Sequence, residues 1–221
     1  MSVGALEIPG RIRRAVARHG VLGALRHAPY LREQPVWYRL DLRDTRETRP
    51  LPEELTLHTG SAGDIARLPE ALLRVRPDNA RARFSVPGTE LWLVEDDVEP
   101  RFACWLFSER TPVATAPGSW LELPAGVVCL EDSMASPAIR GRGVAPAVWT
   151  RLAADLRARG CESLITKVDA SNEPSTRAVG KAGFAEILRM DVRRVGPVWR
   201  AAASSAPTDP LGELLLARLA R

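Results

Sequence analysis

The feature that most constrains the fold of this chain is a glycine-containing loop, PAIRGRGVA at residues 137–145, which lies between a strand pattern and a helix pattern. Residues 127–134 are mostly apolar, as in a buried strand, and residues 143–159 repeat apolar side chains every four positions. Gly141 and Gly143 would leave space at the start of the helix, where unpaired backbone N–H groups and the helix dipole attract anions. This order predicts a phosphate-binding site, although a tight turn before a helix gives the same pattern.

The rest of the chain alternates between strand and helix patterns. Strands are expected at residues 36–42, 55–58, 91–95, 102–107, 127–134, 164–168 and 184–195. Helices are expected at residues 11–27, 61–73, 143–159, 172–183 and 211–219. Residues 110–125 and 201–210 are rich in Pro or small residues and are interpreted as an irregular connection and a linker. The alternation predicts an α/β fold.

Length and charge distribution predict one compact domain with an extension at each end. We assign residues 51–196 of the 221 to the compact domain. Residues 1–50 would form a basic appendage with a helix and a strand, and residues 197–221 a linker and a short C-terminal helix. The appendage holds ten Arg and five acidic residues, which can attract a polyanion such as RNA or a membrane surface. A bias toward arginine is the simpler explanation, because only two of the 31 basic residues are lysines.

Composition and cysteine usage argue against several protein classes. Apolar residues make up 45% of the chain and charged residues 26%, as in soluble globular proteins. No apolar run has the length of a membrane span, and the N-terminus lacks the pattern of a secretory signal, so we expect a cytoplasmic protein without membrane contact. Cys104, Cys129 and Cys161 are odd in number and lack CxxC spacing, so we expect neither a disulfide nor a metal site.

Around the glycine loop the sequence resembles the GNAT acyltransferases. The signature of that family is Arg or Gln, two residues, Gly, one residue, then Gly or Ala, and it is matched by Arg140, Gly143 and Ala145. The strand end EDSMASP, at residues 131–137, is similar to the strand end that precedes the signature in the family. The second conserved block of the family is matched by Asn172, Ser175, Gly183 and Phe184.

The resemblance implies a GNAT fold, an α/β structure whose mixed, mostly antiparallel central sheet is splayed at the cofactor strand and flanked by helices. It also implies acetyl-CoA or another acyl-CoA as cosubstrate, without a metal. Backbone groups of Met134 and Ala135 would bind the pantetheine arm, and Asn172 and Ser175 would lie beside it. The pyrophosphate would be bound by the loop residues Arg140, Gly141, Arg142, Gly143, Val144 and Ala145.

The resemblance also implies acid–base chemistry at the end of the strand before the loop. An attacking amine must be neutral, so a carboxylate could take its proton directly or through water. Glu131 is the first candidate for this general base and Asp132 the second. The alternative is that Glu131 is an ordinary polar residue on a half-exposed strand.

One position departs from the family pattern. Many members carry a tyrosine at the position that matches Val179, where its hydroxyl protonates the departing CoA thiolate. Valine cannot donate a proton, so the proton donor is not identified. A tyrosine restored at this position is expected to fit, because the resemblance places a pocket beside the thiolate.

Three functions remain open at this point. An N-acyltransferase acting on a primary amine of a small molecule or peptide is favoured. A second possibility keeps the fold but takes aminoacyl-tRNA as donor, which the missing tyrosine and the basic residues 1–50 suggest. The third is a non-catalytic acyl-CoA-binding module. A homodimer is a further possible assembly, and the sequence does not identify the acceptor amine.

Overall fold

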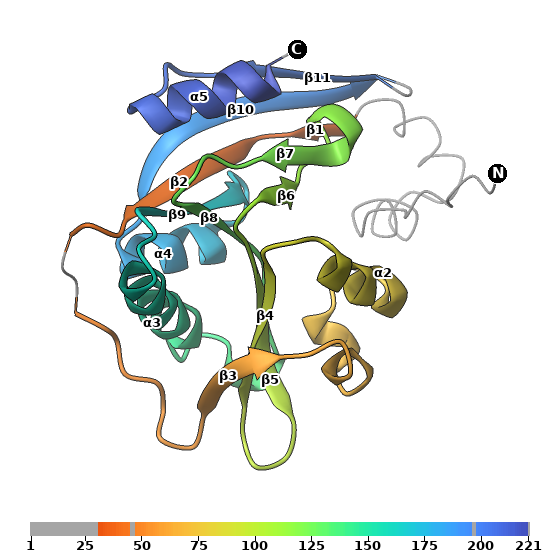
Figure 1. Cartoon of the computed structure of the whole chain (residues 1–221), viewed down its shortest axis with the longest axis vertical. Coiled ribbons are helices and arrows are strands. Elements are labelled where there is room, and N and C mark those ends of the chain that lie inside the picture. Colours follow the sequence, from red (N-terminus) through yellow and green to blue (C-terminus); the bar gives the residue numbers. More distant parts are fainter. Residues whose placement is uncertain (1–30, 45–46, 196–197, 221) are drawn as a thin grey trace.

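The computed structural model describes residues 31–44, 47–195 and 198–220 (Figure 1). The strands of this part of the chain are β1 (Leu31–Glu33), β2 (Pro35–Asp41), β3 (Thr56–Gly60), β4 (Thr89–Glu95), β5 (Pro100–Phe107), β6 (Arg110–Pro112), β7 (Trp120–Glu122), β8 (Val127–Ala135), β9 (Ser163–Asp169), β10 (Ala185–Val195) and β11 (Val198–Ala203). The helices are α2 (Pro77–Ala82), α3 (Val144–Ala158), α4 (Glu173–Ala182) and α5 (Pro210–Leu219). Short 3-10 turns are η1 (Asp64–Ala66), η2 (Glu70–Leu72), η3 (Arg83–Ser85), η4 (Pro117–Ser119) and η5 (Pro137–Ile139).

A mixed and mostly antiparallel sheet organises the described residues. It has nine strands, in the order β1-β10-β2-β9-β8-β5-β4-β3, with β11 on β10, while β6 and β7 form a separate hairpin. The pairs in the large sheet are antiparallel except for β8 with β9. The α/β fold with a mostly antiparallel sheet is therefore confirmed. In the described part of the chain, no helix has the length and apolar character needed to cross a membrane.

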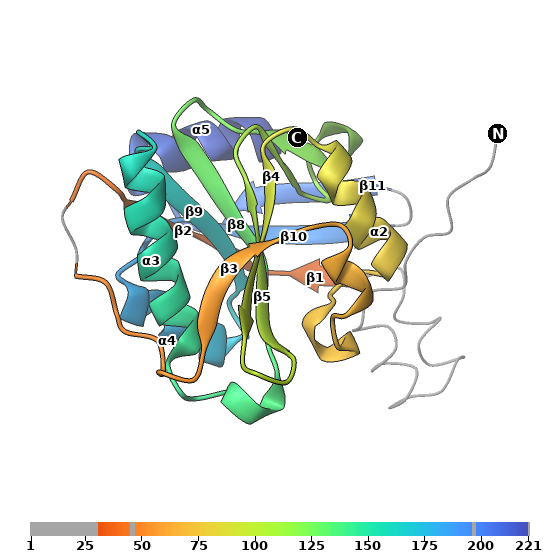
Figure 2. The same cartoon turned by 60° about the horizontal axis from the view of Figure 1, so that its bottom comes forward.

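The core lies on both faces of the sheet. Helices α3 and α4 pack together on one face, as Figure 2 shows, and Val148, Leu152 and Leu156 of α3 are fully buried there. On the other face, α5 and the β6–β7 hairpin cover the β9-β2-β10 half. The segment that contains η1, η2 and α2 covers the β4-β5 half. The opposite face is thus divided into two covered regions that meet near β8.

Strand β2 lies inside the sheet. All seven of its residues pair with β9, and β10 pairs along its other edge. Val36 and Leu40 are buried in the core under α3, and Trp37 is buried on the opposite face. The assignment of this strand to an N-terminal appendage is therefore wrong, since a single apolar strand does not reveal which distant strands it will pair with. The helix expected at residues 11–27 lies outside the described residues.

Three local expectations also need correction. The helix predicted at residues 61–73 is two 3-10 turns, because Pro69 has an extended backbone between them (φ −54°, ψ 145°). Residues 110–125 contain the β6–β7 hairpin, and the expected linker at 201–210 begins with the end of β11. The hairpin of β4 and β5 is confirmed, as are helices α3, α4 and α5.

The two parallel strands separate partway along their length. The pairing of β8 with β9 ends at Leu130 opposite Thr166, although both strands continue. On its other edge β8 contains a bulge, because it has one more residue than β5 between two consecutive paired positions. Asp132 lies in this bulge with a φ of 46°, a left-handed conformation that is uncommon for residues other than glycine. The splay predicted at this strand is therefore present.

Candidate functional site

The glycine loop, residues 140–145, forms an open cradle at the start of α3. Gly141 and Gly143 have φ values of 80° and 78°, which favour glycine, and a Cβ added at either would meet no atom within 4 Å. Gly143 is the N-cap residue of α3, and no side chain caps this helix end. Exposed backbone N–H groups and the positive end of a 15-residue helix therefore face free space. The chemistry of this cradle suits a phosphate or pyrophosphate.

Two arginines of the glycine loop are held by neighbouring oxygen atoms. The Arg140 Nε donates a hydrogen bond of 3.1 Å to the carbonyl oxygen of Ala135, at the end of β8. Arg142 forms an ion pair with Glu54. Both guanidinium groups are exposed, so they can also approach an anion in the cradle. The Val144 side chain is buried in the core, so only the backbone of this residue can take part in the loop.

The start of α4 is capped by a side chain of the same segment. The Asn172 side-chain oxygen accepts a hydrogen bond of 3.3 Å from the backbone N–H of Ser175. This is an ordinary helix N-cap. Asn172 is exposed and Ser175 is half-buried, and α3 and α4 pack in the same core. The two predicted cofactor residues therefore lie at the start of a helix that packs against α3, and the Asn172 oxygen is already used in the cap.

Glu131 occupies the first position of β8 beyond the pairing with β9. Its side chain is 9% exposed and forms an ion pair with Lys167 of β9. The same carboxylate oxygen accepts hydrogen bonds of 3.2 Å from the Thr111 hydroxyl and 3.4 Å from the Cys129 thiol. Burial raises the pKa of Cys129, so this thiol stays protonated and acts as a donor. Glu131 is thus a nearly buried, ion-paired carboxylate and not a half-exposed strand residue.

Lys167 was not identified from the sequence. Its ammonium group donates to Glu131 and, at 3.2 Å, to the carbonyl oxygen of Pro112, and it lies 5.4 Å from the centre of the Trp37 ring. Burial by itself lowers the pKa of Lys167, but the neighbouring anionic groups, led by Glu131, raise it by more, so the net shift is upward. A signal did exist, because Lys167 is one of only two lysines in an arginine-rich chain and lies within the mostly apolar strand pattern at residues 164–168.

Asp132 has different partners from those of Glu131. One of its oxygens lies 2.5 Å from Arg83 Nη2 and the other 3.4 Å from Arg74 Nε. The Arg83 guanidinium also lies over the ring of Trp105, 5.0 Å from its centre. The two neighbouring carboxylates therefore do not converge on one point, and Asp132 links the bulge of β8 to the segment that contains α2.

The position that matches the family tyrosine lies in the hydrophobic core. Val179 is fully buried in the cluster between α3, α4 and the sheet. This burial argues against the expectation that a tyrosine would fit here, because neighbouring side chains surround the valine.

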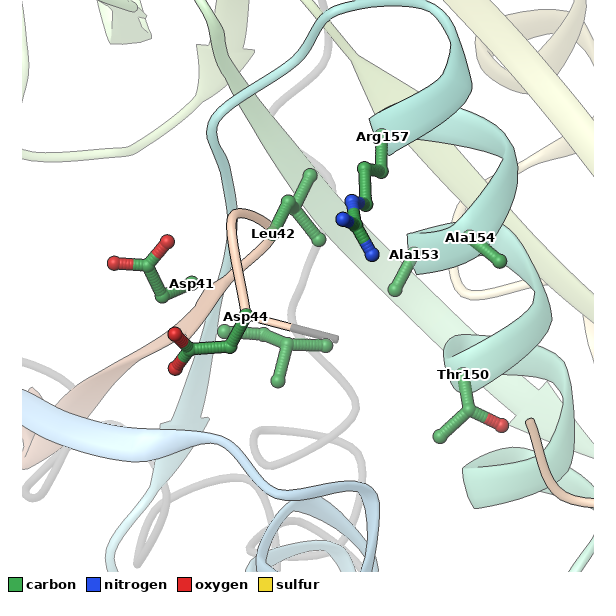
Figure 3. Close-up of a pocket in the computed structure, with 8 residues that line it drawn as sticks. Asp41, Leu42, Asp44, Thr150, Ala153, Ala154 and Arg157 are labelled. Atoms are coloured by element: carbon green, nitrogen blue, oxygen red, sulfur yellow. The ribbon is translucent and has the colours of Figure 1, made fainter. Parts of the chain in front are cut away.

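The described residues form at least two pockets. The first, of about 130 Å³, lies between the end of β2 and the C-terminal half of α3, far along that helix from the glycine loop (Figure 3). Its lining includes Asp41, Asp44 and Arg157 but none of the predicted site residues. The second, of about 120 Å³, opens beside Lys167. Its lining is mostly apolar and comes from β1, β2, β9, β10, β11, α5 and the segment after β6. It includes Trp37, Trp199 and the carboxylate Glu33.

Comparisons with known proteins agree with this geometry. Residues 70–184, just over half of the chain, match the model of the acetyltransferase (GNAT) family. No curated protein matches the sequence. A GCN5-related N-acetyltransferase from Sphaerobacter thermophilus is similar in structure, with a TM-score of 0.56 and 17% identity over 87% of this chain and 60% of that one. A Drosophila protein of known structure has a TM-score of 0.56 and 14% identity, over 82% of this chain and 58% of that one.

The enzyme AAC(6')-Ib, solved with paromomycin and acetyl-CoA, has a TM-score of 0.50 and 16% identity over 68% of this chain and 92% of that one. At these identities the solved structures establish the shared fold. The chain spans about 60% of the length of the Sphaerobacter protein and 58% of the Drosophila protein.

Proposed function

Because the chain belongs to the GNAT acetyltransferase family, we propose that it transfers an acetyl or other acyl group from acyl-CoA to a primary amine of a small molecule or peptide. The observation that carries this proposal is the uncapped glycine cradle at the start of α3, next to the opening between β8 and β9. The solved complex of AAC(6')-Ib with acetyl-CoA and an aminoglycoside supports a small-molecule amine as acceptor.

The glycine loop would bind the pyrophosphate of CoA. Backbone N–H groups at the start of α3 and the guanidinium groups of Arg140 and Arg142 supply donors and positive charge there. Met134 and Ala135 continue β8 beyond its last pairing with β9, and their backbone edge on that side would contact the pantetheine arm, with Arg140 already bound to the Ala135 carbonyl. Asn172 and Ser175 would border the same arm from the start of α4. Acyl-CoA would supply the acyl thioester.

Glu131 would act as the general base. In acyl transfer the amine nitrogen forms a bond to the carbonyl carbon, the carbon–sulfur bond breaks, and the amine loses a proton. Glu131 is the carboxylate at the mouth of the opening between β8 and β9, and its hydrogen bonds to Thr111 and Cys129 fix its orientation. Asp132, paired with Arg83 and Arg74, would serve to hold the bulge of β8. We keep Asp132 as the second candidate for the base.

A direct test combines CoA binding with a thiol-release assay. Acetyl-CoA should raise the melting temperature of the protein, since a ligand that binds only the native state stabilises it. With a panel of primary amines, at least one should release free CoA faster than acetyl-CoA hydrolyses alone. Binding of CoA without release for any amine would support a non-catalytic acyl-CoA-binding module instead.

The tRNA-dependent alternative stays a prediction. The arginines that motivated it, at residues 11–18, lie outside the described residues. It would be favoured by tight binding of purified tRNA that survives moderate salt, because non-specific phosphate contacts weaken steeply as salt rises.

A further inference from the structure

The chain lacks the tyrosine that would protonate the leaving thiolate. Its place on α4 is taken by the buried Val179, and the one tyrosine among the described residues, Tyr38, packs in the core on β2. An alkyl thiol has a pKa near roughly 8.5, so its thiolate can leave unprotonated, but a nearby proton donor would still speed its departure. A group with an N–H or O–H at the opening between β8 and β9 is therefore worth seeking.

Lys167 is placed for this task. It is the first residue of β9 beyond the pairing with β8, and Glu131 is the first residue of β8 beyond the same pairing. The ion pair between them therefore bridges the two strands where they separate. Two of the three ammonium protons are donated to Glu131 and Pro112, and the described residues provide no hydrogen-bond acceptor for the third.

The choice of lysine has a chemical meaning in this chain. Of its 31 basic residues only two are lysines, Lys167 and Lys181, and the rest are arginines. An arginine supplies a permanent charge but does not give up a proton at accessible pH, whereas a lysine can. A lysine at the opening can therefore both neutralise Glu131 and donate a proton.

On the basis of the proposed acyl transfer, we propose that Lys167 is the proton donor to the leaving thiolate and that Glu131 then reprotonates Lys167. Glu131 takes a proton from the attacking amine as the carbon–nitrogen bond forms. Lys167 gives a proton to the sulfur as the carbon–sulfur bond breaks. Glu131 then passes its proton to the neutral Lys167 through their hydrogen bond. One proton leaves the amine and one reaches the thiol, and the Glu131–Lys167 pair returns to its starting state.

The charge state of Glu131 controls how readily Lys167 gives up its proton. In the resting state the Glu131 carboxylate holds the pKa of Lys167 up, which makes it a weak acid. When Glu131 has accepted a proton, this attraction is lost while the burial of Lys167 remains, and burial favours the neutral amine. Lys167 thus becomes a stronger acid at the moment when the thiolate forms. Cys129, Thr111 and Asp132 are polar or charged groups near the pair, and Glu33 and Thr115 line the same pocket as Lys167.

The test compares leaving groups of different acidity. The variant Lys167→Met should lower the turnover of acetyl-CoA by about 10²-fold or more while leaving CoA affinity within a few-fold. With small acetyl thioesters, the same variant should lose far more rate on an alkyl thioester than on a nitrophenyl thioester, because a nitrophenyl thiolate leaves without a proton. Lys181→Met, the other lysine of the chain and exposed on α4, is the matched control and should behave as wild type.

Lys167→Arg keeps the charge and the ion pair but cannot donate, so it should fold normally and stay slow on the alkyl thioester. This variant also carries the test if Lys167→Met fails to fold. Equal losses on both thioesters, full activity in Lys167→Met, or recovery in Lys167→Arg would each overturn the assignment and leave the proposed acyl transfer intact. A wild-type protein that releases no thiol with any amine would overturn both.

Discussion

The glycine loop and the Glu131–Lys167 pair are two parts of one proposed site, and they are built in opposite ways. The loop is a single run of residues that are exposed from Arg140 to Gly143, and the groups proposed to bind the ligand are backbone N–H groups at a helix start. In the pair, Glu131 is nearly buried and Lys167 is half-buried, and the pair depends on side chains from β6, β8 and β9 as well as the Trp37 ring of β2. The loop forms from the conformation of one short segment, whereas the pair forms only when strands distant in the sequence come together.

This difference corresponds to a division of tasks. A backbone cradle recognises a group that every acyl-CoA shares, so it suits donor binding. A buried carboxylate with a fixed cation suits chemistry, because charges interact more strongly away from water. Changes in the loop should therefore alter affinity for CoA, and changes at the pair should alter turnover.

The largest expected effect is on turnover at the pair. Glu131→Gln should lower turnover by about 10² to 10⁴-fold, because a general base contributes that much, while CoA affinity changes little. Steady-state kinetics and CoA titration on the same preparation measure both quantities. Glu173→Gln, on the exposed start of α4, is the control and should match wild type. Parallel losses of binding and turnover would instead mark Glu131 as structural.

The next effect is on affinity at the loop. Gly143→Val should remove the stabilisation by CoA, which for a ligand at 100 times its Kd is about 2.7 kcal/mol, because a side chain would fill the cradle and a left-handed φ strains it. Thermal melts with and without CoA measure this. Gly160→Val imposes similar strain at the other end of α3, where φ is 82° and space is also open. Retention of the CoA shift in folded Gly143→Val would refute the pyrophosphate assignment.

A third change tests the core between loop and pair. Val179→Tyr should destabilise the protein by about 1–3 kcal/mol, because the larger side chain overpacks a fully buried position. It should not raise turnover. Urea unfolding measures the loss, and Val98→Tyr, at a residue 82% exposed, provides the same substitution without overpacking. A stable Val179→Tyr protein with faster turnover would show that the family tyrosine can be accommodated after all.

The smallest effect concerns a carboxylate that belongs to neither part. Hydrogen bonds from the Arg67 and Ser61 side chains lower the pKa of Asp64 to about 2. A lowered pKa stabilises the fold above the unfolded value near 3.9, and this contribution is lost as pH falls toward 2. Asp64→Asn should therefore cost roughly 0.2–1 kcal/mol at pH 6 and roughly half as much at pH 3.

Urea unfolding at the two pH values checks the Asp64 prediction, with the exposed Asp78→Asn as the matched substitution. CoA affinity and turnover should be unchanged in Asp64→Asn. A difference from wild type that is as large at pH 3 as at pH 6 would contradict the assigned pKa.

The sequence predicted the loop well and the pair only in part. Residues 137–145 carry a local signal, since two glycines before a regular helix need no distant partner to be interpreted. Glu131 was found through its place in a strand, but Lys167 and Thr111 reach it from segments 36 and 20 residues away. No local sequence pattern predicts which distant side chains the fold will bring together.

The same reasoning explains the errors in the fold. The strands and helices with strong periodicity, such as α3 and β5, were predicted correctly. The strand at residues 36–42 was recognised, but its partners β9 and β10 lie more than a hundred residues later in the chain. The predicted helix at 61–73 ignored Pro69, whose extended backbone outweighs the favourable start at Ser61.

The divergence of β8 from β9 also gives the sheet an internal edge. Beyond Leu130 and Thr166, the facing backbone groups of the two strands have no strand partner, much as at the outer edge of a sheet. An outer edge can recruit a strand from another protein, but this slot is only a few residues long and is closed at one end by the paired segment. Under the proposed function, it would accept a narrow, extended molecule with amide groups, such as the pantetheine arm, rather than a second polypeptide strand. Unpaired strand edges at the outside of a sheet can cause aggregation, whereas here, inside the sheet, they would select the shape of the ligand.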